Sequence, residues 1–342
     1  MSERGHNSTI SAARAYAMLQ SAMGPDIAAA LADPLTQEVM VNPDGKLRID
    51  RLGEGCSDTG IVIPASQCER IIRLVASHIR AEVTRECPIV SAELPPHGFA
   101  RAGERFEGLL PPVSAAPCFA IRKPATRSYT LDDYVADGLM SPVQADLLRE
   151  SVAAHHNILI AGGTSSGKTT LANALLAEMA ATNERIIIIE DTRELQCAAP
   201  DTVALRTKAG LVTMADLVRS TLRLRPDRII VGEVRGGEAL DMLKAWNTGH
   251  PGGIATVHAN SASAALTRLE QLIQECVATV PRALIAEAID TIIFISGRGA
   301  ERRIASVARL TGLNADGVYD LHELNQFPTP IKPTPIKEAR HG

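Results

Sequence analysis

The eight residues 162–169, with the sequence GGTSSGKT, combine residue types and spacing that can hold a phosphate chain. They fit G-x-x-x-x-G-K-[ST] and lie between an apolar stretch and a helical pattern, which is the context that this loop requires. Its backbone N–H groups can curl around phosphate oxygens, and the following helix adds the positive end of its dipole. The pattern predicts that Lys168 bridges the β- and γ-phosphates of a nucleotide and that Thr169 ligates Mg²⁺. The residues expected to contact the nucleotide are Gly162, Gly163, Thr164, Ser165, Ser166, Gly167, Lys168, Thr169 and Thr170.

Two other apolar stretches end in carboxylates. One ends at Glu233, and the other, residues 186–189, is followed by Glu190, Asp191 and Glu194. Because the C-terminal ends of parallel strands share one edge of a sheet, Glu233 can reach the phosphate loop. Carboxylates beside a cation and a water can supply a general base and metal contacts, and the pattern leaves open which acid does which. A solvated acidic loop is the alternative for Glu190 and Asp191.

A glycine-rich segment, residues 248–253, leads into a third apolar stretch that ends at His258. This places His258 on the same predicted sheet edge, where it could sense the γ-phosphate through a hydrogen bond. A lone histidine is more often structural. The position at a strand end favours a functional role for His258 over one for His250, which lies inside the glycine-rich segment.

The elements that must position these residues follow from hydrophobic patterning. From Asn157 onward, short apolar stretches alternate with longer helical patterns, and a run of four isoleucines shows no alternation. Strands of that kind are buried on both faces, which predicts a doubly wound α/β domain with a parallel sheet. Upstream, alternating apolar residues on both sides of residues 43–45 predict a hairpin, and a helix and three short strands follow.

These patterns divide the chain into five parts. They are a flexible N-terminus over 1–15, a smaller α+β domain over 16–123, a linker and connecting helix over 124–156, the α/β domain over 157–325, and a proline-rich tail over 326–342. Short Ala-rich helices are expected at the start of the first domain. The repeated prolines of the tail forbid a regular helix or ladder, so we expect it to be disordered.

Composition narrows the function classes. The chain has 342 residues, of which 45% are hydrophobic and 3% aromatic, and a net charge of −4. The chain as a whole has no excess of positive charge that would attract nucleic acid. Its six cysteines have neither paired nor ligand-like spacing, which argues against structural zinc and disulfides and favours a reducing cytoplasm. No run approaches the roughly 18 to 20 apolar residues needed to span a bilayer, so any membrane role is expected to be peripheral.

Four blocks of the sequence resemble motifs of the type II/IV secretion ATPase superfamily. GGTSSGKTT, IIIIEDTRE, LRLRPDRIIVGEVRGGEAL and NTGHPGGIATVHANS are similar, in order, to its Walker A, Asp box, Walker B and His box. Together with ERFEGLLPP and FAIRKP, they make the chain resemble the TrbB-type conjugal transfer ATPases of type IV secretion systems. The resemblance covers about residues 30–325.

The resemblance implies a fold, an assembly and site roles. It implies a RecA-like P-loop motor domain behind the N-terminal domain, a homohexamer at the cytoplasmic face of the inner membrane, other secretion-system components as partners, and ATP with Mg²⁺ as cofactors. By motif position, Glu194 resembles a candidate catalytic base and Glu233 the Walker B acid beside Mg²⁺. Arg105 and Arg122 resemble N-terminal-domain arginines that approach the nucleotide. A guanidinium can neutralise charge on the γ-phosphoryl group, although a surface ion pair is the alternative for each arginine.

We therefore expect an ATP-hydrolysing hexameric motor that energises pilus assembly or substrate transfer. Its expected catalytic residues are Lys168, Glu194, Glu233, His258, Arg105 and Arg122, and its expected metal-binding residues are Thr169, Glu190, Asp191 and Glu233. A DNA-translocating helicase is disfavoured by the acidic net charge and few aromatics, because strand-tracking sites use basic grooves with stacking rings. A small-molecule kinase lacks a recognisable acceptor pocket, and an ATP-binding scaffold would not need the acids. Sequence-specific nucleic acid binding is not expected.

Overall fold

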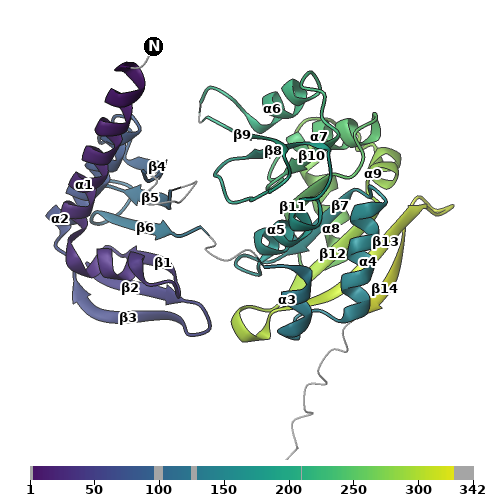
Figure 1. Ribbon diagram of the computed structural model, residues 1–342, viewed down its shortest axis with the longest axis horizontal. Coiled ribbons are helices and arrows are strands. Elements are labelled where there is room, and N and C mark those ends of the chain that lie inside the picture. The colour runs from purple at the N-terminus through teal and green to yellow at the C-terminus, as the bar shows by residue number, and fades with distance from the viewer. Residues whose placement is uncertain (1–2, 96–102, 125–128, 209, 327–342) are drawn as a thin grey trace, which may run out of the picture. The chain divides into compact units, whose positions relative to one another are not determined.

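The structure is a computed structural model that describes residues 3–95, 103–124, 129–208 and 210–326. It divides into two compact units: unit 1 is Met1–Ser128, Glu190–Gln196 and Leu205–Met214, and unit 2 is Tyr129–Ile189, Cys197–Ala204 and Ala215–Gly342. Figure 1 shows two sheets with their helices: β1 to β6 are drawn in purple to blue, and β7 to β14 in teal through green to yellow. The predicted α/β class is confirmed. Most of the predicted disordered tail, residues 327–342, lies outside the described residues.

Unit 1 contains a six-stranded antiparallel sheet with the order β3-β2-β1-β6-β5-β4 in the described part of the chain. Its strands are β1 (Thr36–Val41), β2 (Lys46–Arg51), β3 (Gly55–Val62), β4 (Ile89–Glu93), β5 (Arg105–Leu109) and β6 (Cys118–Arg122). Helices α1 (Glu3–Ala32) and α2 (Ala65–His78) pack on each other, and α2 contacts β4 and β6. The apolar faces of these elements form one core, in which the rings of Phe106 and Phe119 stack 5.6 Å apart.

Helix α1 differs from the sequence prediction at its start. It begins at Glu3, within the stretch for which a flexible N-terminus was predicted, and this agrees with the high helix propensity of its alanines. At Gly24 the backbone leaves the helical region, with φ 75°, just before Pro25. Proline has no N–H for the helical ladder, so two helical segments meet at this kink. The predicted short Ala-rich helices are therefore present, joined end to end.

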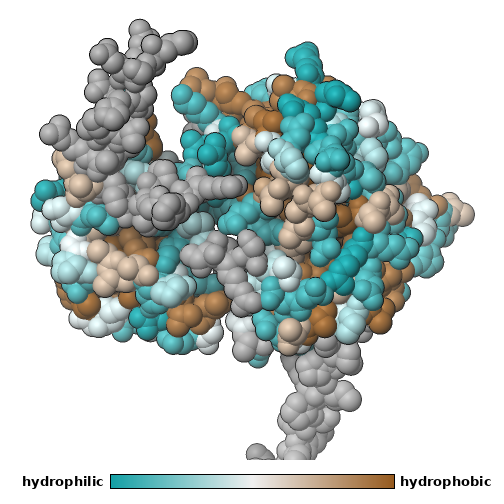
Figure 2. Space-filling model, viewed as in Figure 1, coloured by the Kyte–Doolittle hydropathy of each residue, from teal (hydrophilic) through white to brown (hydrophobic). Residues whose placement is uncertain are grey.

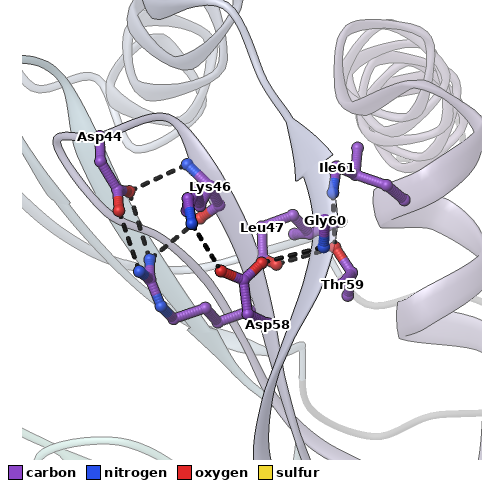
Figure 3. Close-up of polar contacts among 8 residues, drawn as sticks. Asp44, Lys46, Leu47, Asp58, Thr59, Gly60 and Ile61 are labelled. Carbon is purple, nitrogen blue, oxygen red and sulfur yellow. Dashed lines mark hydrogen bonds and ion pairs between the residues drawn. The ribbon is translucent and has the colours of Figure 1, made fainter.

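The predicted hairpin at residues 43–45 is confirmed between β1 and β2. The Asp44 carboxylate accepts a hydrogen bond of 3.0 Å from the backbone N–H of Lys46 and one of 2.9 Å from Nη2 of Arg48. The side chain of Lys46 donates in turn to Asp58 on β3 at 3.0 Å (Figure 3). Aspartate at this position closes the turn through its own side chain, which fixes the register of the three strands.

A second sheet of eight strands has the order β14-β13-β12-β7-β11-β10-β8-β9 in the described residues. Its strands are β7 (Ile158–Gly162), β8 (Arg185–Glu190), β9 (Asp201–Arg206), β10 (Arg228–Val231), β11 (Ile254–His258), β12 (Thr291–Ser296), β13 (Arg303–Leu313) and β14 (Tyr319–Gln326). The helices around it are α3 (Leu131–Ala136), α4 (Pro142–Ala153), α5 (Lys168–Glu178), α6 (Met214–Thr221), α7 (Glu238–Asn247), α8 (Ala262–Gln274) and α9 (Arg282–Ala288), with the short 3₁₀ helix η1 (Gly299–Glu301).

Five neighbouring strands of this sheet, β12, β7, β11, β10 and β8, are parallel, as the unalternating apolar runs predicted. The chain moves from β7 to β8 in one direction along the sheet, and from β10 through β11 to β12 in the other. Because such crossovers are right-handed, α5 covers one face, and α7 and α8 cover the opposite face. The C-terminal ends of the parallel strands thus form one edge, where the predicted site residues follow β7, β10 and β11.

The surface carries both kinds of side chain. Figure 2 shows hydrophilic and hydrophobic residues mixed over the visible face. Large exposed apolar side chains are present at separate places, and Leu211 is the most exposed of them, at 71%. Among the described helices, none combines the length and the hydrophobicity needed to pass through a bilayer.

Candidate active site

The phosphate-loop sequence folds as a tight loop between β7 and α5. Strand β7 is buried along its whole length, and Gly162, its last residue, pairs with His258 on β11 and Ile295 on β12. A Cβ atom at Gly162 would lie 2.5 Å from Oγ of Ser166 and 3.0 Å from the carbonyl oxygen of Ile295. Only glycine fits this position, because the loop folds back onto its own strand end.

The loop leads directly into the N-terminus of α5. Gly167 is the N-cap with φ 95°, a left-handed conformation that glycine adopts without steric cost, and it has no side chain with which to cap the helix. Ser165 also has a positive φ, 60°, which for a residue with a side chain indicates local strain. The loop thus ends at a helix N-terminus, where backbone N–H groups can bind an anion.

Lys168 is buried, with 7% of its surface exposed, and its ammonium group points back into the loop. Nζ donates to the carbonyl oxygens of Gly163 at 2.9 Å and Gly162 at 3.2 Å. It also lies 3.4 Å from Nδ1 of His258. A cation is thus placed beside the backbone donors that would surround a phosphate chain, which is the arrangement the sequence predicted.

Glu233 lies two residues after β10 and contacts two basic side chains. Its Oε1 lies 2.6 Å from Nε2 of His258, and its Oε2 accepts a hydrogen bond from the guanidinium of Arg235. Burial alone would raise the pKa of Glu233, but the hydrogen bond and charge of Arg235 and the charge of Lys168 lower it below its ordinary value. Glu233 is therefore a carboxylate at neutral pH, held in one orientation.

His258 connects Glu233 to Lys168. Burial and the nearby Lys168 charge lower the pKa of His258, and this outweighs the opposite effect of Glu233. The imidazole is accordingly neutral at physiological pH. Because an ammonium can only donate, Nδ1 is the accepting nitrogen, so the proton of the neutral ring is on Nε2. Nε2 is close to Oε1 of Glu233, but this oxygen has no hydrogen-bond partner among the described residues. The structure thus brings together three residues that the sequence placed on separate motifs.

Glu190, the last residue of β8, is buried with 4% of its surface exposed. Burial raises the pKa of its carboxyl to about 7, although hydrogen bonds from the backbone N–H groups of Glu194 (3.0 Å) and Leu195 (2.8 Å) lower it in part. These two bonds fold the loop after β8 around the Glu190 side chain. Glu190 therefore determines where the half-buried Glu194 lies, a role that its position in an acidic run did not suggest.

The oxygen ligands predicted for a metal differ in their surroundings. Asp191 is exposed and accepts a hydrogen bond of 2.8 Å from Oγ1 of Thr207. Within the described ranges, no three His, Cys, Asp or Glu side chains gather closely enough to hold a metal ion alone. Thr169, on the first turn of α5, offers a hydroxyl oxygen, and Glu233, just after β10, offers a carboxylate oxygen. Such oxygen ligands suit a Mg²⁺ ion whose other ligands are phosphate oxygens and waters. Thr169 and Glu233 fit such an ion better than Glu190, whose raised pKa disfavours the charged form.

The remaining candidates from the sequence lie on β5, on β6 and before β11. Arg105 on β5 and Arg122 on β6 are direct partners in the antiparallel register, so unit 1 presents two guanidinium-bearing residues side by side. His250 lies before β11 rather than after it, and its Nδ1 is 2.9 Å from the carbonyl oxygen of Pro226. It belongs to the opposite edge of the sheet from the phosphate loop, in agreement with the preference for His258.

One residue at the loop was not predicted at all. The guanidinium of Arg302, which follows η1, lies against Gly167: a Cβ atom there would be 3.1 Å from Cζ, Nε and Nη1 of this arginine. No motif marks Arg302 in the sequence. The connection between β12 and β13 could have indicated it, but the sequence analysis placed no strand pair after Ile295.

The family described as "Type II/IV secretion system protein" matches residues 65–296. The chain is 49% identical over 296 residues to the conjugal transfer protein TrbB of Rhizobium radiobacter, with 86% of this chain and 90% of that protein covered. It is 48% identical over 325 residues to a probable conjugal transfer protein TrbB of Sinorhizobium fredii, covering 94% of this chain and 95% of that protein.

Among solved structures, the chain resembles the pilus retraction motor PilT with bound ADP. The TM-score is 0.61 at 18% sequence identity, and the match covers 88% of this chain and 83% of that one. At that identity the likeness concerns the fold.

Proposed function

The chain belongs to the type II/IV secretion system protein family, and on that premise we propose that it is the ATP-hydrolysing motor of a conjugative type IV secretion system. The observation that carries the proposal is the contact of Lys168, His258 and Glu233 at the phosphate loop. A loop that only reverses the chain direction has no use for a buried ammonium close to an imidazole and an ionised acid. A nucleotide site can use the ammonium to bind phosphates and the acid to bind the metal.

The roles of these residues follow from their charges. Lys168 would leave the carbonyl oxygens of its own loop and donate to the β- and γ-phosphates. His258 would then respond to the change, because Nδ1 loses the ammonium as its neighbour. Since Nε2 faces Glu233, a movement of the ring is passed to the acid. This links the occupancy of the loop to the position of a carboxylate.

Mg²⁺ belongs to the proposal as a companion of the nucleotide. When bound, it would supply charge neutralisation for the phosphates. Thr169 and Glu233 would hold it through a hydroxyl and a carboxylate oxygen, with Glu190 and Asp191 no nearer than the surrounding shell. Glu233 would need to exchange its bond with Arg235 for this, which the exposed side chain of Arg235 permits.

Water activation is assigned to Glu194. Its backbone is held by the carboxylate of Glu190, so the loop after β8 presents it at a defined place. As a half-buried carboxylate, Glu194 can accept a proton from a water. Arg105 and Arg122 would act as cations toward the phosphates during the reaction, and their pairing on β5 and β6 would let them act together.

The assembly and location are proposed by likeness to the named relatives. We infer an α+β N-terminal domain over 16–123 and a RecA-like motor domain over 157–325, joined by the segment 124–156. The ring would be a homohexamer at the cytoplasmic face of the inner membrane, working with other components of the secretion system. The transported substrate would be moved by domain motions that hydrolysis drives. Sequence-specific binding of nucleic acid forms no part of the proposal.

The experiment that tests this function measures phosphate release and mass in parallel. The full chain should form a hexamer that ATP and Mg²⁺ stabilise, and it should release phosphate from ATP with water as the acceptor. Turnover that depends on added DNA would instead favour a helicase, and turnover that depends on a sugar or nucleoside would favour a kinase. Binding of ATP without any release of phosphate would favour a scaffold.

A further inference from the structure

The turn between β12 and β13 lies beside the phosphate loop. Strand β12 runs parallel to β7 with Ile295 opposite Gly162, so the chain that follows Ile295 leaves the sheet at the same edge as the loop. It passes through η1 and returns as β13. Arg302 ends this turn, and its guanidinium lies flat against Gly167, with Cζ, Nε and Nη1 each 3.1 Å from the place of a Cβ atom.

Arg302 has a donor that nothing in its surroundings uses. Its Nε is buried and has no hydrogen-bond partner among the residues that the structure describes. A buried donor of a charged group without an acceptor is costly, and native structures rarely retain one without a reason. Oxygen atoms of a phosphate group match the fork of guanidinium donors and would satisfy several of them at once.

The turn that carries Arg302 is held in place from outside the sheet. The backbone N–H of Ile304 donates to the carbonyl oxygen of Leu139 at 2.8 Å. The carbonyl oxygen of Ile304 accepts from the buried side chain of Gln144 at 3.3 Å. The segment between α3 and α4 and the start of α4 thus fix β13 two residues after Arg302, so the guanidinium is positioned in advance of any ligand.

The strand order shows which part of a nucleotide Arg302 faces. His258 ends β11 and Glu233 follows β10, on one side of β7, whereas Arg302 follows β12, on the other side. If the terminal phosphate lies toward His258 and the acids, the phosphates nearer to the ribose lie toward β12. We propose that Arg302 binds the inner, α- and β-phosphates of the nucleotide held by the phosphate loop of the same chain; this rests on the proposed function above.

The test is nucleotide binding by the full chain in four forms: wild type, Arg302→Ala, Arg298→Ala and Lys168→Ala. Arg298 is the matched control, because it lies in the same turn and is exposed. Dissociation constants are measured for ADP and for a non-hydrolysable ATP analogue. Losing a charge-assisted hydrogen bond should weaken both by about tenfold to hundredfold, and by the same factor, in Arg302→Ala. Arg298→Ala should bind both nucleotides as wild type does.

The same forms separate the inference from the function beneath it. If the wild type binds ADP, Lys168→Ala does not, and Arg302→Ala binds as the wild type does, the role of Arg302 is wrong and the nucleotide site stands. A loss confined to the triphosphate analogue would also overturn the proposal, because Arg302 would then serve the terminal phosphate. If the wild type binds no nucleotide, the proposed function is wrong, and the role of Arg302, which depends on it, is wrong as well.

The dependence of ADP affinity on ionic strength distinguishes a phosphate-binding role of Arg302 from a purely structural one. Should Arg302→Ala not fold, as judged by its thermal unfolding without nucleotide, Arg302→Gln carries the same measurements with a side chain of similar reach. Because salt screens charged contacts, the affinity of the wild type for ADP should fall more steeply with ionic strength than that of Arg302→Gln. Equal slopes would mean that Arg302 does not contact the phosphates.

Discussion

Nε2 of His258 lies 2.6 Å from Oε1 of Glu233, while Nδ1 of the same ring faces the ammonium of Lys168 at 3.4 Å. The two nitrogens therefore have different neighbours, an acid and a cation. A neutral imidazole can accept from the ammonium through Nδ1, while Nε2 lies close to the carboxylate, whose Oε1 has no hydrogen-bond partner among the described residues. We therefore expect that binding of a nucleotide in the phosphate loop changes the position of the Glu233 carboxylate through His258.

Replacing His258 should separate binding from hydrolysis. We expect His258→Ala to keep ADP affinity close to that of wild type and to lower the rate of phosphate release by about tenfold to a thousandfold, because the link to Glu233 is lost. Steady-state phosphate release and ADP titration measure the two quantities.

His250→Ala is the matched control for that prediction. His250 lies at the other edge of the sheet and contacts the Pro226 carbonyl, so its loss should leave hydrolysis nearly unchanged. Equal effects of the two substitutions would show that His258 acts only through stability.

Glu194→Gln should retain ATP binding and slow hydrolysis. The amide keeps the size of the side chain but cannot accept a proton from water, so we expect a loss of about a hundredfold or more in single-turnover phosphate release. An unchanged rate would place the base elsewhere, with Glu233 the first residue to examine.

Glu190→Gln should stabilise the protein above neutral pH. The pKa of Glu190 is raised to about 7 by burial, against 4.5 as its ordinary value, so the folded state favours the proton. The contribution of Glu190 to stability is therefore fully present below about pH 4.5 and is lost as the pH rises to about 7. The amide removes this loss, by an amount on the order of 2–3 kcal/mol, and still accepts from two N–H groups.

Thermal unfolding without nucleotide at about pH 5 and about pH 8 measures this effect. Glu190→Gln should unfold at a higher temperature than wild type at the higher pH and at a similar one at the lower pH. Asp191→Asn is the control, because Asp191 is the exposed neighbour. A gain of the same size at both values would contradict the burial argument.

Gly162→Ala should damage the loop, and Gly163→Ala should not. A Cβ atom at Gly162 meets Ser166 and Ile295, whereas one at Gly163 has nothing within 4 Å. We expect Gly162→Ala to lose about 1–3 kcal/mol of stability and to weaken nucleotide binding. Denaturant unfolding of both variants compares them, and an equal loss would mean that the fold-back of the loop is not what demands glycine.

The parts of the fold and of the site that could be predicted from the sequence are those whose residues are neighbours in the chain. The loop 162–169 could be recognised because its glycines, lysine and threonine are adjacent in the chain. The hairpin at 43–45 was predicted because Asp44 closes it from within. His258 was favoured over His250 because it stands at the end of the apolar stretch that forms β11. Each of these depends on neighbours in sequence.

Other features depend on contacts that no local pattern encodes. The burial of Glu190 arises from the packing of β8 and the loop behind it, so an acidic run suggested a solvated loop or a metal ligand instead. The antiparallel pair β13 and β14 was not predicted, and neither was Arg302, although Asp316 and Gly317 form a turn signal between the two strands. The contact of Arg302 with Gly167 joins residues 135 apart and exists only in the fold.

The most direct test of the account is ATP binding and phosphate release by the wild type and Lys168→Ala, each shown by thermal unfolding to be folded. The account predicts that the wild type binds ATP and releases phosphate, and that Lys168→Ala has lost one or both while remaining folded. Phosphate release by Lys168→Ala at the wild-type rate would contradict it.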